Sequence, residues 1–351
     1  MKKVIVTGVT GQVGSYMVEY LLKNTNYEIF GAIRRLSVPN HKNIKHIDDP
    51  RFKLIELDLT DEFSIFSVVQ EIQPDYFINL AANSYVGDSW KMPLHHFDTN
   101  ALGVMRQLES IRKICPKCRY YNAGSSEEFG DVAYTPQDAK HPLRPRSPYG
   151  ASKASARQIV KVWRDSYDLF AIQGWLFNHE SERRGPEFVT RKITKKVAKI
   201  KKDIEKNIKG DTFEIQPLEL GNLDAKRDWS PADDFVHGIW LMLNQESPKE
   251  YVLASGETYT VREFVELAFK YANIGTERNY KWRGSGTDEA LYFGTIPVVK
   301  INKQFYRPAE VELLLGDPSE AQKGLDWEKS VDFSTLVRRM VEHDIEEINA
   351  T

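Results

Sequence analysis

The amino-acid sequence predicts an α/β protein, in which a Rossmann-type doubly wound parallel sheet is accompanied by a smaller, discontinuous C-terminal substrate domain. The chain opens with a β-branched run, VIVTG, followed by glycines and then by apolar residues at helical spacing. Further strand-like runs (YEIFGAI, FKLIELD, PDYFINLAA, CRYYNAG, FAIQGWLF) alternate with helical patterns such as EFSIFSVVQEI. Strands that alternate with helices indicate a parallel sheet, which binds ligands at the carboxyl ends of its strands.

Three glycines stand between the first strand and the first helix. Gly8, Gly11 and Gly14 form the pattern G-x-x-G-x-x-G. Glycines here allow a tight turn and a close approach of the backbone to a pyrophosphate, which the free N–H groups of the helix N-terminus can bind. A plain glycine turn is the alternative, but the strand–turn–helix context favours a dinucleotide site.

The end of the second strand indicates which dinucleotide binds. An NAD site usually carries an acidic residue near this point, where it binds the ribose hydroxyls. Arg34 and Arg35 stand here instead, and guanidinium groups suit a 2′-phosphate. We therefore expect NADP as the cofactor, with a solvated basic loop as the alternative interpretation.

The next two strand ends complete the expected cofactor site. Asp58 and Leu59 follow the third strand and could meet the adenine. Leu80, Ala81 and Ala82 end the fourth strand, where small residues let a cofactor pass close over the sheet.

Two groups of reactive side chains follow the fifth strand. Ser125, Ser126 and Glu127 come directly after CRYYNAG, and Tyr149 and Lys153 lie one turn apart on a helix that begins with Ser-Pro. A nearby ammonium favours the phenolate and so lowers the pKa of a tyrosine, which makes Tyr149 a plausible base toward a sugar hydroxyl. A positioned carboxylate at Glu127 can act as a second general base.

Both groups also have simpler explanations, namely a solvated Tyr–Lys pair and a solvated loop acid. Their place in a dinucleotide fold favours a chemical role. A non-catalytic NADP-binding protein would usually lose the pair or the carboxylate, and this chain keeps both.

The composition argues against several classes of protein. The 351-residue chain carries 48 basic and 50 acidic residues, a balance that disfavours a dedicated nucleic-acid binder. No apolar run approaches the ~20 residues of a membrane helix, and the N-terminal run is too short for a signal peptide, so a cytoplasmic protein is expected. Cys115 and Cys118 form a lone CxxC, which could be a redox pair or half of a zinc site. Two reduced cysteines and no metal are favoured, because no second ligand pair follows.

A set of motifs spread over almost the whole chain resembles one family within the extended short-chain dehydrogenases/reductases. The motifs are TGVTGQVGSY, IRR, DLTD, NLAA, SSE, SPYGASK, LFNHESERRG, FVTRKIT, GNLDAKRDW and FYRPAEVELLLGDP. In these the chain is similar to the GDP-mannose 4,6-dehydratases. The resemblance implies GDP-mannose or a related nucleotide sugar as substrate, and a homodimer or a homotetramer, the latter through the segment after Arg35. Dehydration of another nucleotide sugar (a GDP-heptose, or a dTDP- or UDP-hexose) is the alternative. A 4-epimerase or keto-reductase of the same superfamily would need the serine and the Tyr–Lys pair but no base at C5, so Glu127 favours the dehydration that the resemblance implies.

The resemblance also implies a role for individual residues. Catalysis would fall to Ser125, Glu127, Tyr149 and Lys153. Beyond the strand-end residues above, the cofactor would contact Thr10, Gln12, Val13, Tyr149, Lys153, His179 and Arg184. The substrate would contact Ser84, Ser126, Asn178, Val189, Lys192, Gly221, Arg227, Arg307 and Glu310, with arginines at the diphosphate and the glutamate at a ribose.

Five positions depart from the pattern of the family. Val13 replaces a usual aspartate, Ser125 a threonine and Phe129 a tyrosine. Asn83 and Tyr85 replace a glutamine and a histidine near the expected sugar position, so they bear on which hexose is accepted. Serine keeps the hydroxyl of threonine, so the same mechanism is expected.

The second domain is expected to be small and discontinuous. We assign residues 1–185 to the NADP-binding domain with a return segment near 217–245, and residues 186–216 and 246–351 to the domain that binds the nucleotide sugar. The segment FVTRKITKKVAKIKKDIEKNIKG predicts a basic amphipathic helix with a solvated face. Its early residues Arg191 and Lys192 are expected to contact phosphate.

Overall fold

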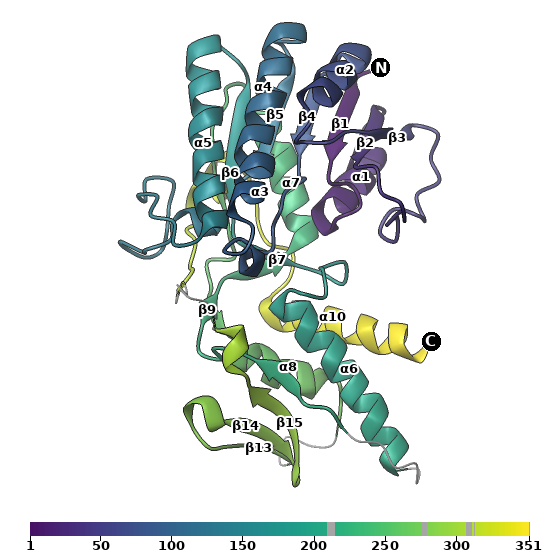
Figure 1. The fold of residues 1–351 in the computed structure, drawn as a ribbon, viewed down its shortest axis with the longest axis vertical. Coiled ribbons are helices and arrows are strands. Elements are labelled where there is room, and N and C mark those ends of the chain that lie inside the picture. The colour runs from purple at the N-terminus through teal and green to yellow at the C-terminus, as the bar shows by residue number, and fades with distance from the viewer. Residues whose placement is uncertain (209–214, 275–278, 307–310, 312, 351) are drawn as a thin grey trace.

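The fold is known from a computed structural model, which describes residues 1–208, 215–274, 279–306, 311 and 313–350. Figure 1 shows a larger upper part, in which helices flank a central sheet, and a smaller lower part. The chain starts in the upper part and ends in a helix of the lower part (Figure 1).

The central sheet contains seven strands in the order β11-β6-β5-β4-β1-β2-β3. They are β1 (Lys3–Thr7), β2 (Glu28–Ile33), β3 (Phe52–Glu56), β4 (Tyr76–Asn79), β5 (Arg119–Ala123), β6 (Ala171–Leu176) and β11 (Val252–Leu253). All neighbours pair in parallel, with Val6 of β1 opposite Gly31 of β2 and Ile78 of β4. The chain reverses its direction of winding between β1 and β4, which opens a crevice at the carboxyl ends. The predicted doubly wound sheet is therefore confirmed.

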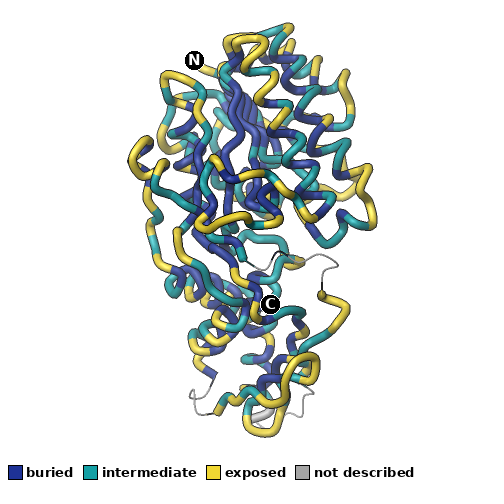
Figure 2. The backbone as a smooth tube through the Cα atoms, turned by 90° about the vertical axis from the view of Figure 1, so that its left-hand side faces the viewer, coloured by how far each residue is buried: buried dark blue, intermediate teal, exposed yellow. Residues whose placement is uncertain are grey.

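Helices cover both faces of this sheet. Alternation along β1 sends Val4 and Val6 to one face and Ile5 to the other. The first face packs on α1 (Gln12–Asn24), α7 (Ala232–Leu243) and α9 (Ser319–Leu325), and the second on α2 (Glu62–Ile72), α4 (Gly103–Ile114) and α5 (Pro148–Tyr167). Figure 2 shows the buried strands between these helices, whose outward sides are exposed. Two apolar cores of this kind make the upper part a rigid support for its loops.

The smaller part has its own core. Its helices are α6 (Val189–Ile208), α8 (Val261–Tyr271) and α10 (Phe333–Asn349), and its sheet has the order β13-β14-β15-β8 with bounds Tyr280–Arg283, Ala290–Phe293, Ile296–Ile301 and Leu218–Leu220. Ile193, Val197, Ile200 and Ile204 recur at helical spacing along α6 and are buried against this sheet and the other two helices. The predicted basic amphipathic helix therefore exists, with its apolar side inward.

Short helical turns and strands lie between the longer elements. They are η1 (Val86–Asp88), α3 (Pro93–Phe97), η2 (Asp98–Leu102), η3 (Ser126–Glu128), β7 (Asn178–Glu180), β9 (Lys226–Arg227), β10 (Trp229–Pro231), β12 (Tyr259–Thr260), η5 (Gly286–Asp288) and η6 (Lys303–Phe305). In the described part of the chain, no helix combines the length and the apolar character needed to cross a membrane.

The strand pairing bears on the return segment, which the sequence analysis placed near 217–245. β8 pairs with β15 in the small sheet, whereas β10 pairs with β7 and β11 extends the large sheet beyond β6. A two-residue strand such as VL carries too little pattern to be assigned from sequence, which is why β11 was missed. We propose that the return segment runs from about β10 to β11, residues 229–253.

Candidate active site

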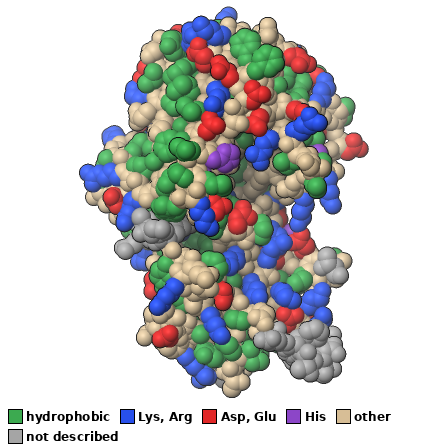
Figure 3. Space-filling view, in the orientation of Figure 1, with side chains coloured by type: hydrophobic (Ala, Val, Ile, Leu, Met, Phe, Trp, Pro, Cys, Tyr) green, Lys and Arg blue, Asp and Glu red, His purple; other side chains and the backbone are tan. Residues whose placement is uncertain are grey.

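A cavity of about 1170 Å³ lies between the carboxyl edge of the large sheet and the smaller part. The glycine turn, the ends of β2 to β6 and the start of α5 line it on one side, and α6 with the segment around β8 and β9 on the other. Figure 3 shows the surface hollowed between the two parts, with basic side chains around the hollow. Its volume exceeds that of a typical small-molecule pocket, so it has room for more than one ligand.

The glycine turn is packed so closely that side chains are excluded. Gly8 adopts φ +70°, and Gly11 N donates to Gly8 O at 2.9 Å. A Cβ on Gly14 would lie 2.1 Å from Gly8 O, which is far inside van der Waals contact. Behind the turn, Gln12 Nε2 donates to His179 O at 2.9 Å. The turn therefore brings bare backbone and the start of α1 to the cavity, as an anion site requires.

Every residue expected to contact the cofactor lines this cavity. They are Gly8, Thr10, Gly11, Gln12, Val13, Gly14, Arg34, Arg35, Asp58, Leu59, Leu80, Ala81, Ala82, Tyr149, Lys153, His179 and Arg184. Arg34 and Arg35 are exposed at the end of β2. Burial raises the pKa of Asp58, but hydrogen bonds from Thr60 and the charge of Arg34 outweigh it, and the pKa is lowered. Asp58 is therefore an anion beside Arg34.

The Ser-Ser-Glu cluster forms a single turn of 3₁₀ helix. Ser125 is its N-cap, and the Ser125 Oγ accepts a hydrogen bond from Glu127 N at 3.2 Å. Ser125, Ser126 and Glu127 line the cavity. Glu128 does not line it and is completely buried. Of two consecutive glutamates, only Glu127 is thus placed to meet a ligand.

Tyr149 and Lys153 face the same cavity from the first turns of α5, but their protonation differs from the expectation. Burial raises the pKa of Tyr149 to about 12, although a hydrogen bond with Ser125 lowers it in part. Burial also lowers the pKa of Lys153 to about 8. Lys153 Nζ lies 6.0 Å from the centroid of the Tyr149 ring and donates to Ala123 O at 2.9 Å. The expected lowering of the tyrosine pKa is therefore wrong for this structure, because desolvation dominates.

Most of the expected substrate residues line the same cavity. Those that line it are Ser84, Ser126, Asn178, Val189, Lys192, Gly221 and Arg227, whereas Arg307 and Glu310 lie outside the described residues. Lys192 Nζ lies 3.3 Å from the centroid of the Phe305 ring, and burial lowers its pKa. Asn178 Oδ1 is buried and has no hydrogen-bond partner among the described residues. These groups offer a cation and an acceptor to a polar ligand.

Arg227 is held in place by its neighbour. Asp228 is completely buried and accepts hydrogen bonds from Ser255 N at 2.7 Å, Gly256 N at 3.1 Å and Gly316 N at 3.2 Å. These bonds join three segments of the chain at the base of β9. They hold the backbone of the neighbouring Arg227, which lines the cavity.

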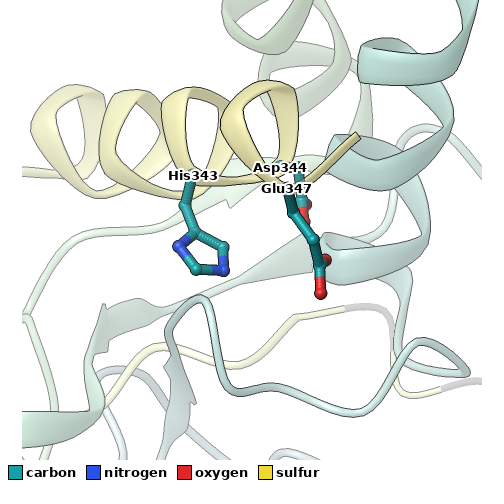
Figure 4. A group of neighbouring side chains, drawn as sticks. All are labelled: His343, Asp344 and Glu347. Atoms are coloured by element: carbon teal, nitrogen blue, oxygen red, sulfur yellow. The ribbon is translucent and has the colours of Figure 1, made fainter. Parts of the chain in front are cut away.

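Arg191 does not contact the cavity, so its expected phosphate contact is wrong. Its guanidinium pairs with Asp344, with Nη2–Oδ1 at 2.6 Å and Nε–Oδ2 at 3.0 Å. Asp344 lies near His343 and Glu347 in Figure 4, a combination of residue types that can bind metals. Glu347, however, is already paired with Lys42, Arg191 and Lys195. The group is therefore an ion-pair cluster that fastens α10 to α6.

Sequence reasoning missed several residues of the site. Glu187, Phe188 and Phe305 also line the cavity, and the rings of Tyr85 and Phe188 meet edge to face at 5.9 Å. Phe188 and Phe305 begin the motifs FVTRKIT and FYRPAEVELLLGDP, which were a signal for them, whereas their meeting in one cavity depends on the tertiary packing. A buried polar network behind Ser125 was also missed, although polar residues inside apolar strands (YFIN, RYYNA, AIQGWL) are a signal for it.

The strand order, the glycine turn and the cavity above the point where the sheet reverses define a class: a Rossmann-type dinucleotide-binding protein with an added second domain. The comparison with family models is more specific. The model described as GDP-mannose 4,6 dehydratase matches residues 5–340. The chain therefore belongs to the GDP-mannose 4,6-dehydratase family, and the resemblance found in the sequence is confirmed.

Individual relatives match over nearly the whole chain. A GDP-mannose 4,6 dehydratase from Drosophila melanogaster is 44% identical over 356 residues, which cover 98% of this chain and 86% of the relative. One from Dictyostelium discoideum is 42% identical, with 99% and 97% covered. Among solved structures, dTDP-glucose 4,6-dehydratase from Bacillus anthracis in complex with NAD has a TM-score of 0.78 at 21% identity, with 100% of this chain and 98% of that chain covered. The last likeness concerns the fold alone.

Proposed function

We propose that this chain is a lyase that converts GDP-mannose to GDP-4-keto-6-deoxymannose. The observation that carries the proposal is that Ser125, Glu127 and Tyr149 line one cavity, in a chain whose relatives are named for this reaction. A hydroxyl, a carboxylate and a phenol are the three groups that the reaction requires. The net chemistry is loss of one water from the hexose.

We propose that the cavity binds a nicotinamide dinucleotide, with NADP favoured over NAD. The Gly8 to Gly14 turn lines the cavity with bare backbone and the start of α1, as a pyrophosphate site requires. Arg34 and Arg35 line the cavity at the end of β2, where guanidinium groups suit a 2′-phosphate. When bound, the nicotinamide would accept a hydride from C4 of the sugar and return it to C6. The residues of the chain perform the remaining steps.

Oxidation at C4 requires a proton to leave O4. Tyr149 takes this proton as base, and Lys153 keeps a positive charge close to the tyrosine. Ser125, which forms a hydrogen bond with Tyr149, lies where it can donate to O4 as the carbonyl develops. Burial by itself favours the neutral phenol, which cannot accept a proton, so Tyr149 acts as base in its phenolate form. The positive charges of Lys153 and, when bound, of the oxidised nicotinamide would favour that form.

The carbonyl at C4 makes the C5 proton acidic. Glu127 removes this proton as general base, and water leaves from C6 with a proton supplied by Glu127 or a nearby hydroxyl. A hydride at C6 and a proton at C5 then complete the 4-keto-6-deoxy sugar. The cofactor ends in the state in which it began, so the reaction needs no external oxidant or reductant.

The other end of the cavity suits a nucleoside diphosphate. Lys192 and Arg227 line it with positive charge, as a diphosphate requires. Family membership favours GDP-mannose over other nucleotide sugars. Assembly into a homodimer or a homotetramer stays a prediction, which light scattering of the purified protein would check.

The proposal is tested by incubating the protein and NADP with GDP-mannose in deuterated water, followed by mass spectrometry. The expected product has lost one water and gained one deuterium at C5. A GDP-heptose, dTDP-glucose and UDP-glucose are run in parallel. Conversion of only one of these would replace GDP-mannose as the substrate, and no conversion of any sugar by cofactor-loaded protein would refute the proposal.

A further inference from the structure

Glu127 and Glu128 are consecutive, yet they occupy opposite environments. Glu127 lines the cavity, whereas Glu128 is 0% exposed. Burying a carboxylate is costly unless it is paired and hydrogen-bonded. A buried charge directly behind the proposed base therefore needs an explanation, and its contacts supply one.

The carboxylate of Glu128 is saturated with donors. Its Oε1 accepts from Ser125 N at 2.7 Å and from Gln173 Nε2 at 3.0 Å. Its Oε2 accepts from Arg157 Nε. Arg157 is itself buried, stacks 3.4 Å from the centroid of the Trp175 ring and pairs with Glu250 at 2.9 Å on its other side. Glu128 thus anchors the first residue of the Ser125 turn to a rigid ion pair.

The same network reaches the lysine of the site. Gln173 Nε2 also donates to the backbone oxygen of Lys153 at 3.0 Å. Gln173 Oε1 accepts from Asn122 Nδ2 at 2.6 Å, and Asn122 Oδ1 accepts from Asn79 Nδ2 at 2.7 Å. Glu128 is therefore one end of a buried chain of hydrogen bonds that crosses from β4 to β6 beneath the site.

The chain of hydrogen bonds also reaches the glycine turn. Asn79 Oδ1 accepts from Thr7 Oγ1 at 2.6 Å, and Thr7 Oγ1 accepts from Leu80 N and Ala81 N at 3.1 and 3.0 Å. Thr7 directly precedes Gly8. One continuous buried network therefore ties the end of β1 to the Ser125 turn.

We propose that Glu128 is a positioning residue, whose buried carboxylate holds the Ser125–Glu127 turn at the distance from the sugar that the reaction requires. The inference rests on the proposed dehydration. Ser125 and Glu127 act on O4 and C5, and both belong to the turn that Glu128 anchors through Ser125 N. Small displacements of reacting groups are expensive, with a 1 Å misplacement costing up to ~100-fold in rate.

A carboxylate is needed here because both of its oxygens accept. A glutamine has nearly the same shape but only one acceptor oxygen. If this oxygen faces Ser125 N, its amide N–H groups point at Arg157, and if it faces Arg157, they point at Ser125 N. Either orientation places donor against donor and releases one end of the anchor.

The test is Glu128→Gln, compared with Glu250→Gln as matched control. Both changes remove one carboxylate from Arg157, but Glu250 makes no hydrogen bond with the Ser125 turn among the described contacts. Glu128→Gln is expected to lower kcat for GDP-mannose about 10- to 100-fold with little change in KM. Glu250→Gln is expected to lower the melting temperature while kcat stays unchanged.

A double variant separates stability from positioning. Replacing both members of a buried ion pair by apolar residues is often neutral or stabilising. Glu128→Leu with Arg157→Met is therefore expected to have a higher melting temperature than Glu128→Leu alone but no higher kcat, because Ser125 N still lacks its acceptor. Recovery of kcat together with stability would overturn the positioning role.

A readout independent of activity is amide exchange at Ser125. In the wild-type protein this N–H is protected by Glu128, and Glu128→Gln is expected to exchange faster there while Glu250→Gln does not. Unchanged exchange and unchanged kcat in Glu128→Gln would refute this inference alone. A wild-type protein that converts no nucleotide sugar would instead refute the proposed function.

Discussion

Lys153 Nζ donates a hydrogen bond to Ala123 O at 2.9 Å, in a site where only 3% of the lysine is exposed. Burial moves the pKa of this ammonium from 10.5 to about 8. Below pH 8 the folded protein therefore holds a buried charge that the unfolded chain would solvate. Burial of the Lys153 ammonium therefore lowers the free energy of unfolding by an amount that depends on pH.

The sign of the dependence follows from proton binding. Between pH 8 and 10.5 the unfolded chain binds more protons at this site, so this lysine makes stability rise with pH across that window. Lys153→Met removes the buried charge and should raise the free energy of unfolding at pH 7 by about 1–3 kcal/mol. Urea unfolding of the wild type and the variant at pH 7 and pH 10, with nucleotide absent, measures this free energy. A variant less stable than the wild type at pH 7 would contradict the assigned cost.

Ser125→Ala removes the proposed donor to O4. We expect kcat to fall ~100-fold, because a preorganised donor to a developing oxyanion typically contributes that much. Steady-state turnover of GDP-mannose measures the change. Ser125→Thr is the matched control, since it keeps the hydroxyl and the cap of the turn, and it should retain most activity. An equal fall in kcat in both variants would indicate that altered packing, and not loss of the hydroxyl, lowers the activity.

Glu127→Gln keeps the size of the side chain but removes the base. Water loss should be blocked by at least ~100-fold, whereas some oxidation at C4 should persist and appear as NADPH absorbance. Single-turnover spectra with GDP-mannose measure both. An unchanged rate of water loss would remove Glu127 from the mechanism.

Gly14→Ala tests the packing of the glycine turn. Its Cβ would approach Gly8 O to 2.1 Å, while a Cβ on Gly11 would approach the same atom only to 3.2 Å. We expect Gly14→Ala to abolish tight binding of NADP in calorimetric titration and to lower the melting temperature by several degrees. Gly11→Ala should be distinctly milder. The reverse ranking would show that the turn is packed differently.

Arg34→Ala and Arg35→Ala test the choice of cofactor. Loss of a guanidinium partner of the 2′-phosphate should weaken NADP binding by about 10-fold or more. NAD binding should hardly change, because NAD carries no phosphate at this position. Parallel titrations with NADP and with NAD give the ratio of the two dissociation constants for each variant. Equal weakening for both would place the arginines elsewhere than at the 2′-phosphate.

Much of the architecture was predictable because its signals are local. Apolar residues recur every two residues in strands and every 3.6 residues in helices, and such patterns depend only on neighbouring residues. The same holds for the glycine turn after β1 and the Ser-Pro start of α5, and these elements form. β11 was not predictable, because two residues carry no period. The phosphate role expected of Arg191 was wrong for a related reason: its partner Asp344 is 153 residues away, and no local pattern reports such a pairing.

By itself the sequence determined the doubly wound sheet, the family and the order of the reactive groups along the chain, since these follow from local spacing and from motifs. Only the tertiary structure decided how consecutive residues divide their roles. Glu127 and Glu128 have the same side chain, and one lines the cavity while the other is paired with Arg157. Burial likewise decided the protonation of Tyr149 and Lys153, because the desolvation of a charge depends on everything packed around it and not on its neighbours in the chain.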